Sequence, residues 1–426
     1  MVEVSFSGDG WDAFAAVRAV ASWSDMLKRG IATFTLDTGK CPKWLFARMV
    51  RLGREVVELL IEEFGPDEFV RRMGDPVWFQ SLGTLLAFDW NASGLTTTLT
   101  AALKEAIRGR ERALGIAICG GKGKTSRKTP EEILRYGFLL PLPDRAVPSL
   151  QYSSRMAAKV DSALVQDGFA IYHHAFFFSA SGAWSVVQQG MNPSLGMARR
   201  YHWHSAVLED FVRRPHAAIH AECLLGSALN LVAEESARTR DLSVKMVQEG
   251  SARSILRDLQ LLDRFASRQL CLVRAARPGG EELAALELSR RDFSWHPVVN
   301  EQFSESRYLK NILAKVVEEC PASYEELVAM KGVGATTIRA LALVAEVIYG
   351  AAPSYRDPAR YSFAFGGKDG VPFPVSRERY DEVLAILQRV VERLRIDRSE
   401  KRSAAARLRQ LPRSLQPPLP SPRGER

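Results

Sequence analysis

The chain has 426 residues, more than one small core requires, and this length predicts two or three domains. Its hydrophobic content of 46% and charged content of 25% are those of a globular protein, which excludes a largely disordered chain. The net charge is +9, but residues 399–426 hold seven basic residues and two glutamates, so +5 lies in this segment. A DNA-binding face on the rest of the chain must therefore come from local clustering of basic residues.

The cysteines are odd in number, scattered and without a CxxC pair: Cys41, Cys119, Cys223, Cys271 and Cys320. This pattern argues against a disulfide framework and against a cysteine-rich zinc site. The apolar stretch Trp11–Trp23 contains Arg18 and does not resemble a signal peptide. No uninterrupted apolar run reaches the roughly 18 residues that a membrane span needs. We expect a cytoplasmic, nucleoid-associated protein without a membrane segment.

Apolar periodicity and breaker residues predict the elements in chain order. An amphipathic helix over 1–30 and a short strand over 31–36 precede a long helix from Pro42 to Phe64. Further helices are expected over 67–73, 76–88, 95–107, 149–164, 222–267, 306–350 and 380–394, with strands over 114–119, 169–178 and 184–187. The pattern indicates an α+β fold, mainly helical, with a small central antiparallel or mixed sheet and a C-terminal helix-hairpin-helix module.

Breaks in the pattern suggest four regions. Residues 1–147 form a mainly helical region, 148–277 a central α+β region with a histidine-rich hairpin, and 278–398 a helical region with the helix-hairpin-helix. The boundary near 278 rests on a Pro-Gly-Gly loop signal. Pro-Pro and Ser-Pro steps mark residues 399–426 as a disordered basic tail.

The most specific motif is the segment from Lys331 to Arg339, in which Gly-Val-Gly interrupts a helical pattern. Glycine allows positive φ and close backbone approach, so two helices can meet at a tight turn. The turn amides and the next helix N-terminus would then face one phosphate of DNA. Such contacts hold the backbone without reading sequence. The expected contact residues are Lys331, Gly332, Val333, Gly334, Thr336, Thr337 and Arg339.

A second glycine-rich segment, Gly120 to Thr125, follows a predicted strand and precedes a helix. It does not match a nucleotide-binding P-loop, because Ile118 occupies the position of the first glycine. A basic glycine loop beside a helix N-terminus can still hold a DNA phosphate, through Gly121, Lys122 and Lys124. Lys368, in the later loop Phe365–Gly370, would extend the same contact.

Six of the seven histidines lie between residues 173 and 220. Alternation along a strand predicts that Asp167 and His173 share one face, and that His202 and His204 share a face. Together with glutamines and arginines they suggest a phosphodiester-cleaving centre, with Asp167, His173, His174, Gln188, Gln189, Arg199, Arg200 and His202 as catalytic candidates. Mg²⁺ or Mn²⁺ would be the ion, and Asp167, His173, His202 and His204 the candidate ligands. The alternative is a buried structural network.

These motifs together predict a DNA-binding, DNA-processing protein, a phosphodiesterase or nuclease of repair or recombination. One alternative is a non-catalytic DNA-binding protein. Another is a helix-hairpin-helix DNA glycosylase that uses Asp357, 23 residues beyond Gly334, although the Val-Asp-Thr-His surroundings of that family are absent.

The chain resembles the domain-of-unknown-function family numbered 763 over most of residues 31–395. The resemblance rests on motifs spread along the chain: Lys43-Trp44-Leu45-Phe46, Gly120-Gly-Lys-Gly, Gln166-Asp-Gly, Tyr172-His-His, Trp184 to Asn192, Ala198 to Trp203, Gly332-Val-Gly and Phe365 to Gly370. This family carries no assigned activity, so the resemblance implies membership without a reaction.

Overall fold

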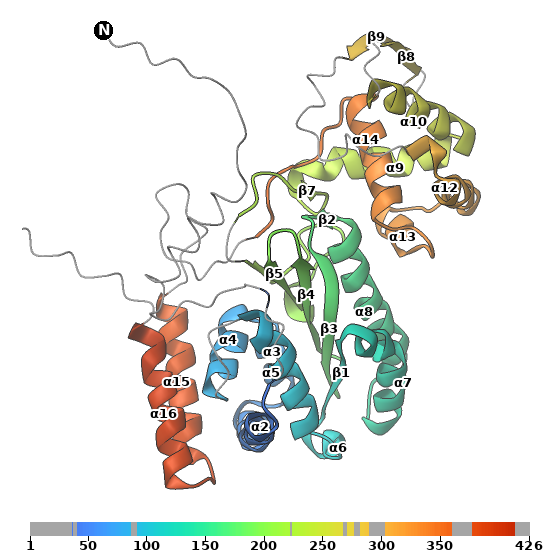
Figure 1. The fold of residues 1–426 in the computed structure, drawn as a ribbon. Helices are drawn as coiled ribbons and strands as arrows, with labels where there is room; N and C mark the ends of the chain where they lie inside the picture. The colour runs from blue at the N-terminus through green and yellow to red at the C-terminus, as the bar shows by residue number, and fades with distance from the viewer. Residues whose placement is uncertain are drawn as a thin grey trace, which may run out of the picture.

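The structure is a computed structural model that describes residue 36 and residues 41–86, 92–221, 224–266, 271–276, 282–288, 303–359 and 377–413. It shows a mainly helical α+β fold built around one antiparallel sheet (Figure 1), as the sequence predicted. No helix within these ranges has the length and apolarity that crossing a bilayer requires. The predicted elements before residue 36 and the loop that contains Lys368 lie outside the described residues.

The central sheet has five strands in the order β1 (Ile116–Lys122), β3 (Ala170–Ser179), β4 (Trp184–Asn192), β5 (Met197–His204) and β6 (Ala218–His220), and every neighbouring pair is antiparallel. The predicted histidine-rich hairpin is β3–β4, and β5 continues it as a meander. Two small antiparallel pairs accompany the sheet: β2 (Val165–Gln166) with β7 (Leu229–Asn230), and β8 (Cys271–Ala276) with β9 (Glu282–Leu288).

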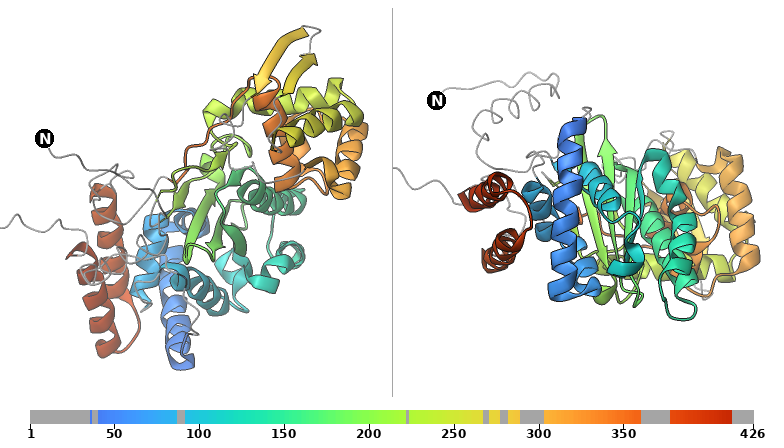
Figure 2. Two further views of the ribbon diagram at one scale, coloured as in Figure 1. Left: turned by 45° about the horizontal axis from the view of Figure 1, so that its top comes forward. Right: turned by 90° about the horizontal axis from the view of Figure 1, so that it is seen from below.

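One face of the sheet packs against α2 (Lys43–Phe64), α3 (Pro66–Met73), α4 (Pro76–Leu85) and α5 (Ala92–Ala106). Strand alternation turns Ala175, Phe177 and Val187 toward these helices, where all three are buried. Beyond α4 lie α15 (Arg377–Arg393) and α16 (Arg398–Arg413), so that the layers follow one another from these helices to the sheet (Figure 2).

The opposite face packs against α7 (Thr129–Leu139) and α8 (Ala146–Ala163), with Phe176, Phe178 and Trp203 buried between them. The same core continues into a helical group formed by α9 (Ala237–Glu249), α10 (Ala252–Ala266), α12 (Arg307–Glu319), α13 (Tyr324–Ala329) and α14 (Ala335–Val347). Residues 224–236, predicted to be helical, instead contain strand β7 and a short 3-10 turn. The backbone of β7 pairs with β2, so it is not free to form helical hydrogen bonds.

The two cores do not follow the predicted domain boundaries. Val383, Leu387 and Leu408 pack into the core that α2–α5 form, so segments at opposite ends of the sequence share one core. The tail predicted to be disordered is helical as far as Arg413. Ala404 and Leu408, one helical turn apart, form the buried face of this helix. The Pro-rich residues that follow led to the prediction of disorder for the whole segment.

The end of β1 depends on glycine. Gly120 has φ +82°, and a Cβ there would lie 2.2 Å from the carbonyl oxygen of His174. We expect Gly120→Ala to lower the free energy of unfolding by roughly 3 kcal/mol or more, because strain and a backbone clash add. Gly123, at φ +59° in open space, is the matched control and should cost only about 1–2 kcal/mol as alanine. Urea unfolding measures both, and equal losses would contradict the close contact at Gly120.

Candidate functional site

The histidine-rich block is divided by the sheet. A β-bulge lies between Ile171 and His173, where the register shifts, so the predicted alternation from Asp167 to His173 fails. His173 points to α5, where its Nε2 lies 3.2 Å from Thr100 Oγ1. His174 points to α8, with Nε2 2.8 Å from Ser154 Oγ. The prediction that Asp167 and His173 share a face is therefore wrong.

On the α4–α5 face, the buried Arg200 forms a network with neutral groups. Its guanidinium donates to Gln80 Oε1 at 3.2 Å and lies 2.9 Å from Nδ1 of His220, while Thr96 Oγ1 is 3.3 Å away. Burial lowers the pKa of Arg200 to about 9. Gln189 is anchored to the carbonyl of Ser93 on the same side.

The histidines of this face are held neutral. Burial lowers the pKa of His173 to about 3, with smaller effects of His174 and Lys122. Burial and the nearby Arg200 place the pKa of His202 well below its ordinary value. The side chains of His173, Gln189, Arg200 and His202 are all enclosed in the core, so none of them is exposed to a substrate.

The predicted metal ligands do not meet. Asp167 lies on the α8 side of the sheet, whereas His173 contacts α5, His202 contacts Phe79 of α4, and His204 lies beside Gly74. Within the described ranges, no three His, Cys, Asp or Glu side chains gather into a group that could hold a metal ion. The sheet therefore lies between Asp167 and the three histidines.

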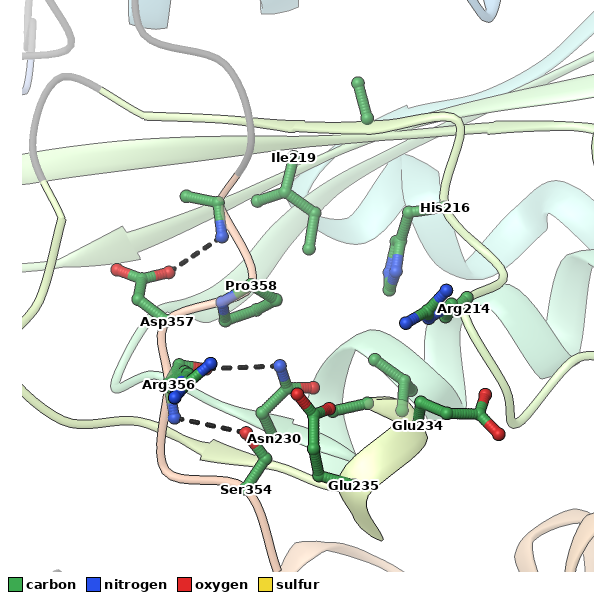
Figure 3. A pocket seen from close by; sticks show the side chains of 14 residues that line it. Arg214, His216, Ile219, Asn230, Glu234, Glu235, Ser354, Arg356, Asp357 and Pro358 are labelled. Carbon is green, nitrogen blue, oxygen red and sulfur yellow. Dashed lines mark hydrogen bonds between the residues drawn. The ribbon is translucent and has the colours of Figure 1, made fainter. Parts of the chain in front are cut away.

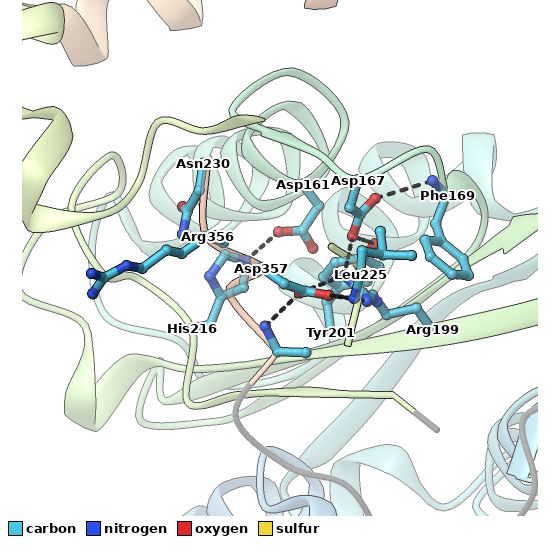
Figure 4. A network of polar contacts seen from close by, with 11 residues as sticks. Asp161, Asp167, Phe169, Arg199, Tyr201, His216, Leu225, Asn230, Arg356 and Asp357 are labelled. Atoms are coloured by element: carbon cyan, nitrogen blue, oxygen red, sulfur yellow. Dashed lines mark hydrogen bonds and ion pairs between the residues drawn. The ribbon is translucent and has the colours of Figure 1, made fainter. Parts of the chain in front are cut away.

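On the α8 side, Arg199 bridges two buried carboxylates (Figure 4). Its Nη1 donates to Asp167 Oδ2 and to Asp357 Oδ1, each at 2.9 Å, and its Nη2 donates to Asp357 Oδ2 at 2.7 Å. The three side chains are at most 3% exposed. Arg199 therefore joins β5, the segment after β2 and the segment after α14.

Both carboxylates accept further hydrogen bonds. Asp167 accepts from the Tyr201 hydroxyl at 2.7 Å and from the Phe169 amide, and Asp357 accepts from the amides of Leu225 and Ala359. Burial raises the pKa of Asp167, against the opposing effects of Arg199 and Tyr201. Burial would lower the pKa of Arg199, but its two carboxylate partners raise it. Asp357 therefore accepts hydrogen bonds from Arg199 and from two backbone amides, which suits a structural role. These contacts do not favour the catalytic role that the glycosylase alternative gives to Asp357.

A third buried carboxylate on this side, Asp161 of α8, orients a histidine. Its Oδ1 lies 2.5 Å from Nε2 of His216, and its Oδ2 accepts from the Trp203 indole at 3.0 Å and from Gln188. Gln188 Oε1 in turn lies 2.9 Å from Nδ1 of His174. The hydrogen-bond chain thus runs from Ser154 through the core to His216.

His216 lines a pocket of 410 Å³ between β6, β7 and the segment after α14. Figure 3 shows Arg356 on one side of this pocket and Arg214 with His216 on the other. The remaining polar lining residues are Asn230, Glu234, Glu235, Ser354 and Asp357. Sequence reasoning missed Arg214, His216 and Arg356 as site residues. The histidine clustering contained a signal for His216, but nothing in the sequence brings residue 356 beside residue 216.

The α13–α14 connection is a tight turn. Gly332 has φ +95°, while Gly334 has an extended backbone with φ −143°. Val333 is buried between the helices, and Lys331 and Thr336 are exposed. Thr337 is only 1% exposed, so it cannot contact a ligand as predicted. Arg339 donates to Gln166 Oε1 at 2.7 Å, which ties it to β2.

Neighbouring elements hold this turn rigidly. Tyr308 of α12 donates to the Gly332 carbonyl at 2.9 Å, and Lys159 of α8 donates to the carbonyls of Val328 and Met330. Gln166 donates to the Ala335 carbonyl at 3.1 Å. Burial and the neighbouring cations Arg155 and Lys315 lower the pKa of Lys159 to about 8.

The Gly120 loop borders a separate pocket of 560 Å³ between β1 and α5. Gly120, Gly121 and Lys122 line it, and its other basic residues are Lys104, Arg108 and Lys128. Lys104 is held by Glu132 at 2.7 Å. Lys124 is exposed on the following 3-10 turn and is not part of the lining.

Arg199→Met tests the two-carboxylate bridge. It leaves two buried carboxylates without their cation and should lower the free energy of unfolding by about 3–5 kcal/mol at neutral pH. The folded-state pKa of Asp167 is already raised, so its folded form binds more protons than the unfolded chain, and stability falls as pH rises through that pKa. Loss of Arg199 raises this pKa further, so the variant should recover part of its stability on acidification.

Urea unfolding at about pH 5 and about pH 8 measures the difference. The exposed Arg112→Met is the matched control and should leave stability within about 0.5 kcal/mol at both values. If the loss of unfolding free energy in Arg199→Met is as large at about pH 5 as at about pH 8, the assignment of buried, ionised carboxylates is contradicted.

Comparison with known proteins identifies a relationship at the family level. The family model described as "Protein of unknown function (DUF763)" matches residues 30–375. No curated protein and no solved structure matches the chain.

Proposed function

The chain belongs to the DUF763 family, and from its own geometry we propose that it binds DNA by the phosphate backbone at the α13–α14 turn. The observation that carries the proposal is the uncapped, glycine-flanked N-terminus of α14. Helix α14 begins after Gly334, and no side chain caps its first turn. The amides of this turn lack acceptors within the helix and suit an anionic phosphate oxygen.

The approach to these amides is open. No heavy atom beyond its chain neighbours lies within 4 Å of a Cβ built on Gly334, so a phosphate can come close to the backbone. Lys331 and Thr336 flank the turn and are exposed. Tyr308, 61% exposed and bonded to the Gly332 carbonyl, adds an aromatic surface on which a base can stack.

A second contact is proposed at the Gly120 loop, where Lys122 and Lys128 line the basic pocket. Neither lysine takes part in an ion pair among the described residues, so both charges are available to phosphate. Backbone contacts of this kind position a protein on DNA without reading the bases. Such binding fits a protein that recognises DNA structure during repair or recombination.

Gly334→Asp separates binding from folding. Aspartate is a preferred N-cap and favours the positive end of the helix, so α14 should be as stable as before or slightly more stable. The same carboxylate occupies the amides and repels phosphate, so DNA affinity should fall roughly tenfold or more. Fluorescence anisotropy with labelled duplex and single-stranded DNA measures affinity, and thermal unfolding measures stability.

The matched control is Gly226→Asp, which adds the same charge at an exposed glycine with nothing within 4 Å of its Cβ position. It should bind DNA as the parent does. Parental affinity in a folded Gly334→Asp variant would exclude the turn as the DNA contact. An equal loss of DNA affinity in both variants would show that the added negative charge, and not its position, weakens binding.

The salt dependence of binding tests the lysines. Removal of one lysine that pairs with a phosphate should reduce the slope of log affinity against log salt concentration by about 1. We expect this change for Lys331→Ala, and for Lys122→Ala if the Gly120 loop contacts the same DNA. Lys43, at the exposed start of α2, supplies the control substitution. An unchanged slope in Lys331→Ala would remove that lysine from the interface.

A further inference from the structure

The pocket beside β6, which His216 lines, supports an inference about catalysis. We infer that Arg214, His216 and Arg356 form a site that binds a phosphate ester and hydrolyses it, with His216 as the proton acceptor. None of these three residues belongs to the turn or to the Gly120 loop proposed for DNA binding. The inference is therefore independent of the proposed DNA contact and can fail without it.

His216 has the arrangement of an oriented base. Its Nε2 is engaged by Asp161 Oδ1 at 2.5 Å, and Asp161 is fully buried. The Trp203 ring packs against the imidazole with 4.7 Å between ring centroids, which fixes the plane of the ring. A carboxylate on one ring nitrogen sets the tautomer and stabilises the imidazolium that forms when the other nitrogen takes a proton.

The other ring nitrogen, Nδ1, is left for the pocket. It makes no hydrogen bond to any described residue, and His216 lines the pocket wall. Asp161 is itself held by Trp203 and by Gln188, which His174 and Ser154 support in turn. A side chain held through four successive partners has lost its rotational freedom before substrate arrives, which is the preorganisation that acid–base catalysis requires.

Two arginines provide the anion contacts. Neither Arg214 nor Arg356 donates a side-chain hydrogen bond or forms an ion pair among the described residues, so their planar donor groups are available to phosphate oxygens. Arg214 also has φ +45°, a left-handed conformation that is unfavourable for a residue with a side chain, and its amide donates to the Val232 carbonyl at 2.9 Å. Strained backbone of this kind is concentrated at functional sites.

The acidic groups of the pocket are arranged to leave this centre cationic. Asp357 is neutralised by Arg199, and Glu234 is paired with Arg213 outside the lining. The Arg213 hydrogen bond lowers the pKa of Glu234. Glu235 is exposed at the rim. An anionic ester therefore meets the guanidinium groups of Arg214 and Arg356. Among the described lining residues, Glu235 is the one carboxylate that forms no ion pair.

Water is the nucleophile in this scheme. Ser354 is the one hydroxyl residue among the described lining residues, and its Oγ accepts from the Arg356 amide and does not contact His216. A water oxygen forms the new bond to phosphorus while one of its protons passes to Nδ1 of His216. The phosphorus–oxygen bond to the alcohol breaks on the opposite side of phosphorus, and the departing oxygen takes a proton from solvent water. His216 then releases to solvent the proton that it accepted. The net change is the addition of one water across the ester bond.

Two chromogenic probes test the inference and distinguish the source of the phosphate. The full chain is incubated with bis(4-nitrophenyl) phosphate, a diester, and with 4-nitrophenyl phosphate, a monoester, with Mg²⁺ present. Turnover of the diester indicates an internal phosphodiester as substrate, and turnover of the monoester indicates a terminal phosphate. His216→Gln should lower kcat about 100-fold or more with little change in KM. Arg356→Ala should raise KM roughly tenfold.

Asp161→Asn tests the positioning role, and its kcat loss should come with a displaced acid limb of the pH–rate profile, which a purely structural residue would not move. Arg112 is exposed and is not part of the pocket lining, so Arg112→Ala is the control and should retain parental kcat and KM. Circular dichroism checks that each variant is folded. Failure of the parent chain to turn over either probe, or parental kcat in a folded His216→Gln, would overturn the inference, whatever the DNA affinity of the same proteins.

Discussion

The structure depends on one buried cation, Arg199, placed between the carboxylates of Asp167 and Asp357. An isolated charge in the core would be strongly unfavourable, so each of these three groups is tolerated only because the others are present. The bridge joins a central strand, the turn after β2 and a distant segment of the chain, at sequence separations of 32 and 158. It therefore fixes the position of the C-terminal helical group relative to the sheet.

Both proposed sites follow from this connection. Residues 354–359, which Asp357 anchors, form one wall of the His216 pocket and carry Arg356 into it. Gln166, next to Asp167, donates to the first turn of α14 and accepts from Arg339, so the turn proposed to bind DNA is attached to the same corner of the sheet. The proposed DNA contact and the proposed hydrolytic site are therefore both connected to the Arg199 bridge.

The histidine-rich block illustrates why composition alone can mislead about function. Its residues are buried on both faces of a sheet, and neutral histidines there pair with Thr100, Ser154, Gln188 and the buried arginine of β5. The clustering of six histidines correctly marked an unusual region, but strand alternation and one bulge determined which side chains share a face. One member of the block, His216, reaches a pocket, and it lies outside the strands that drew attention first.

The sequence by itself determined the mainly helical α+β class, the helices from Lys43 to Phe64 and across α12–α14, the β3–β4 hairpin and the tight turn at Gly332, because hydrophobic periodicity and glycine act over a few residues. Only the tertiary structure decided that α16 closes the N-terminal core, that Asp357 pairs with Arg199, and that Asp161 orients His216 beside Arg356. The two carboxylate contacts join residues 158 and 55 positions apart. Such separations leave no local pattern, because these contacts are selected by burial and charge compensation in the assembled core.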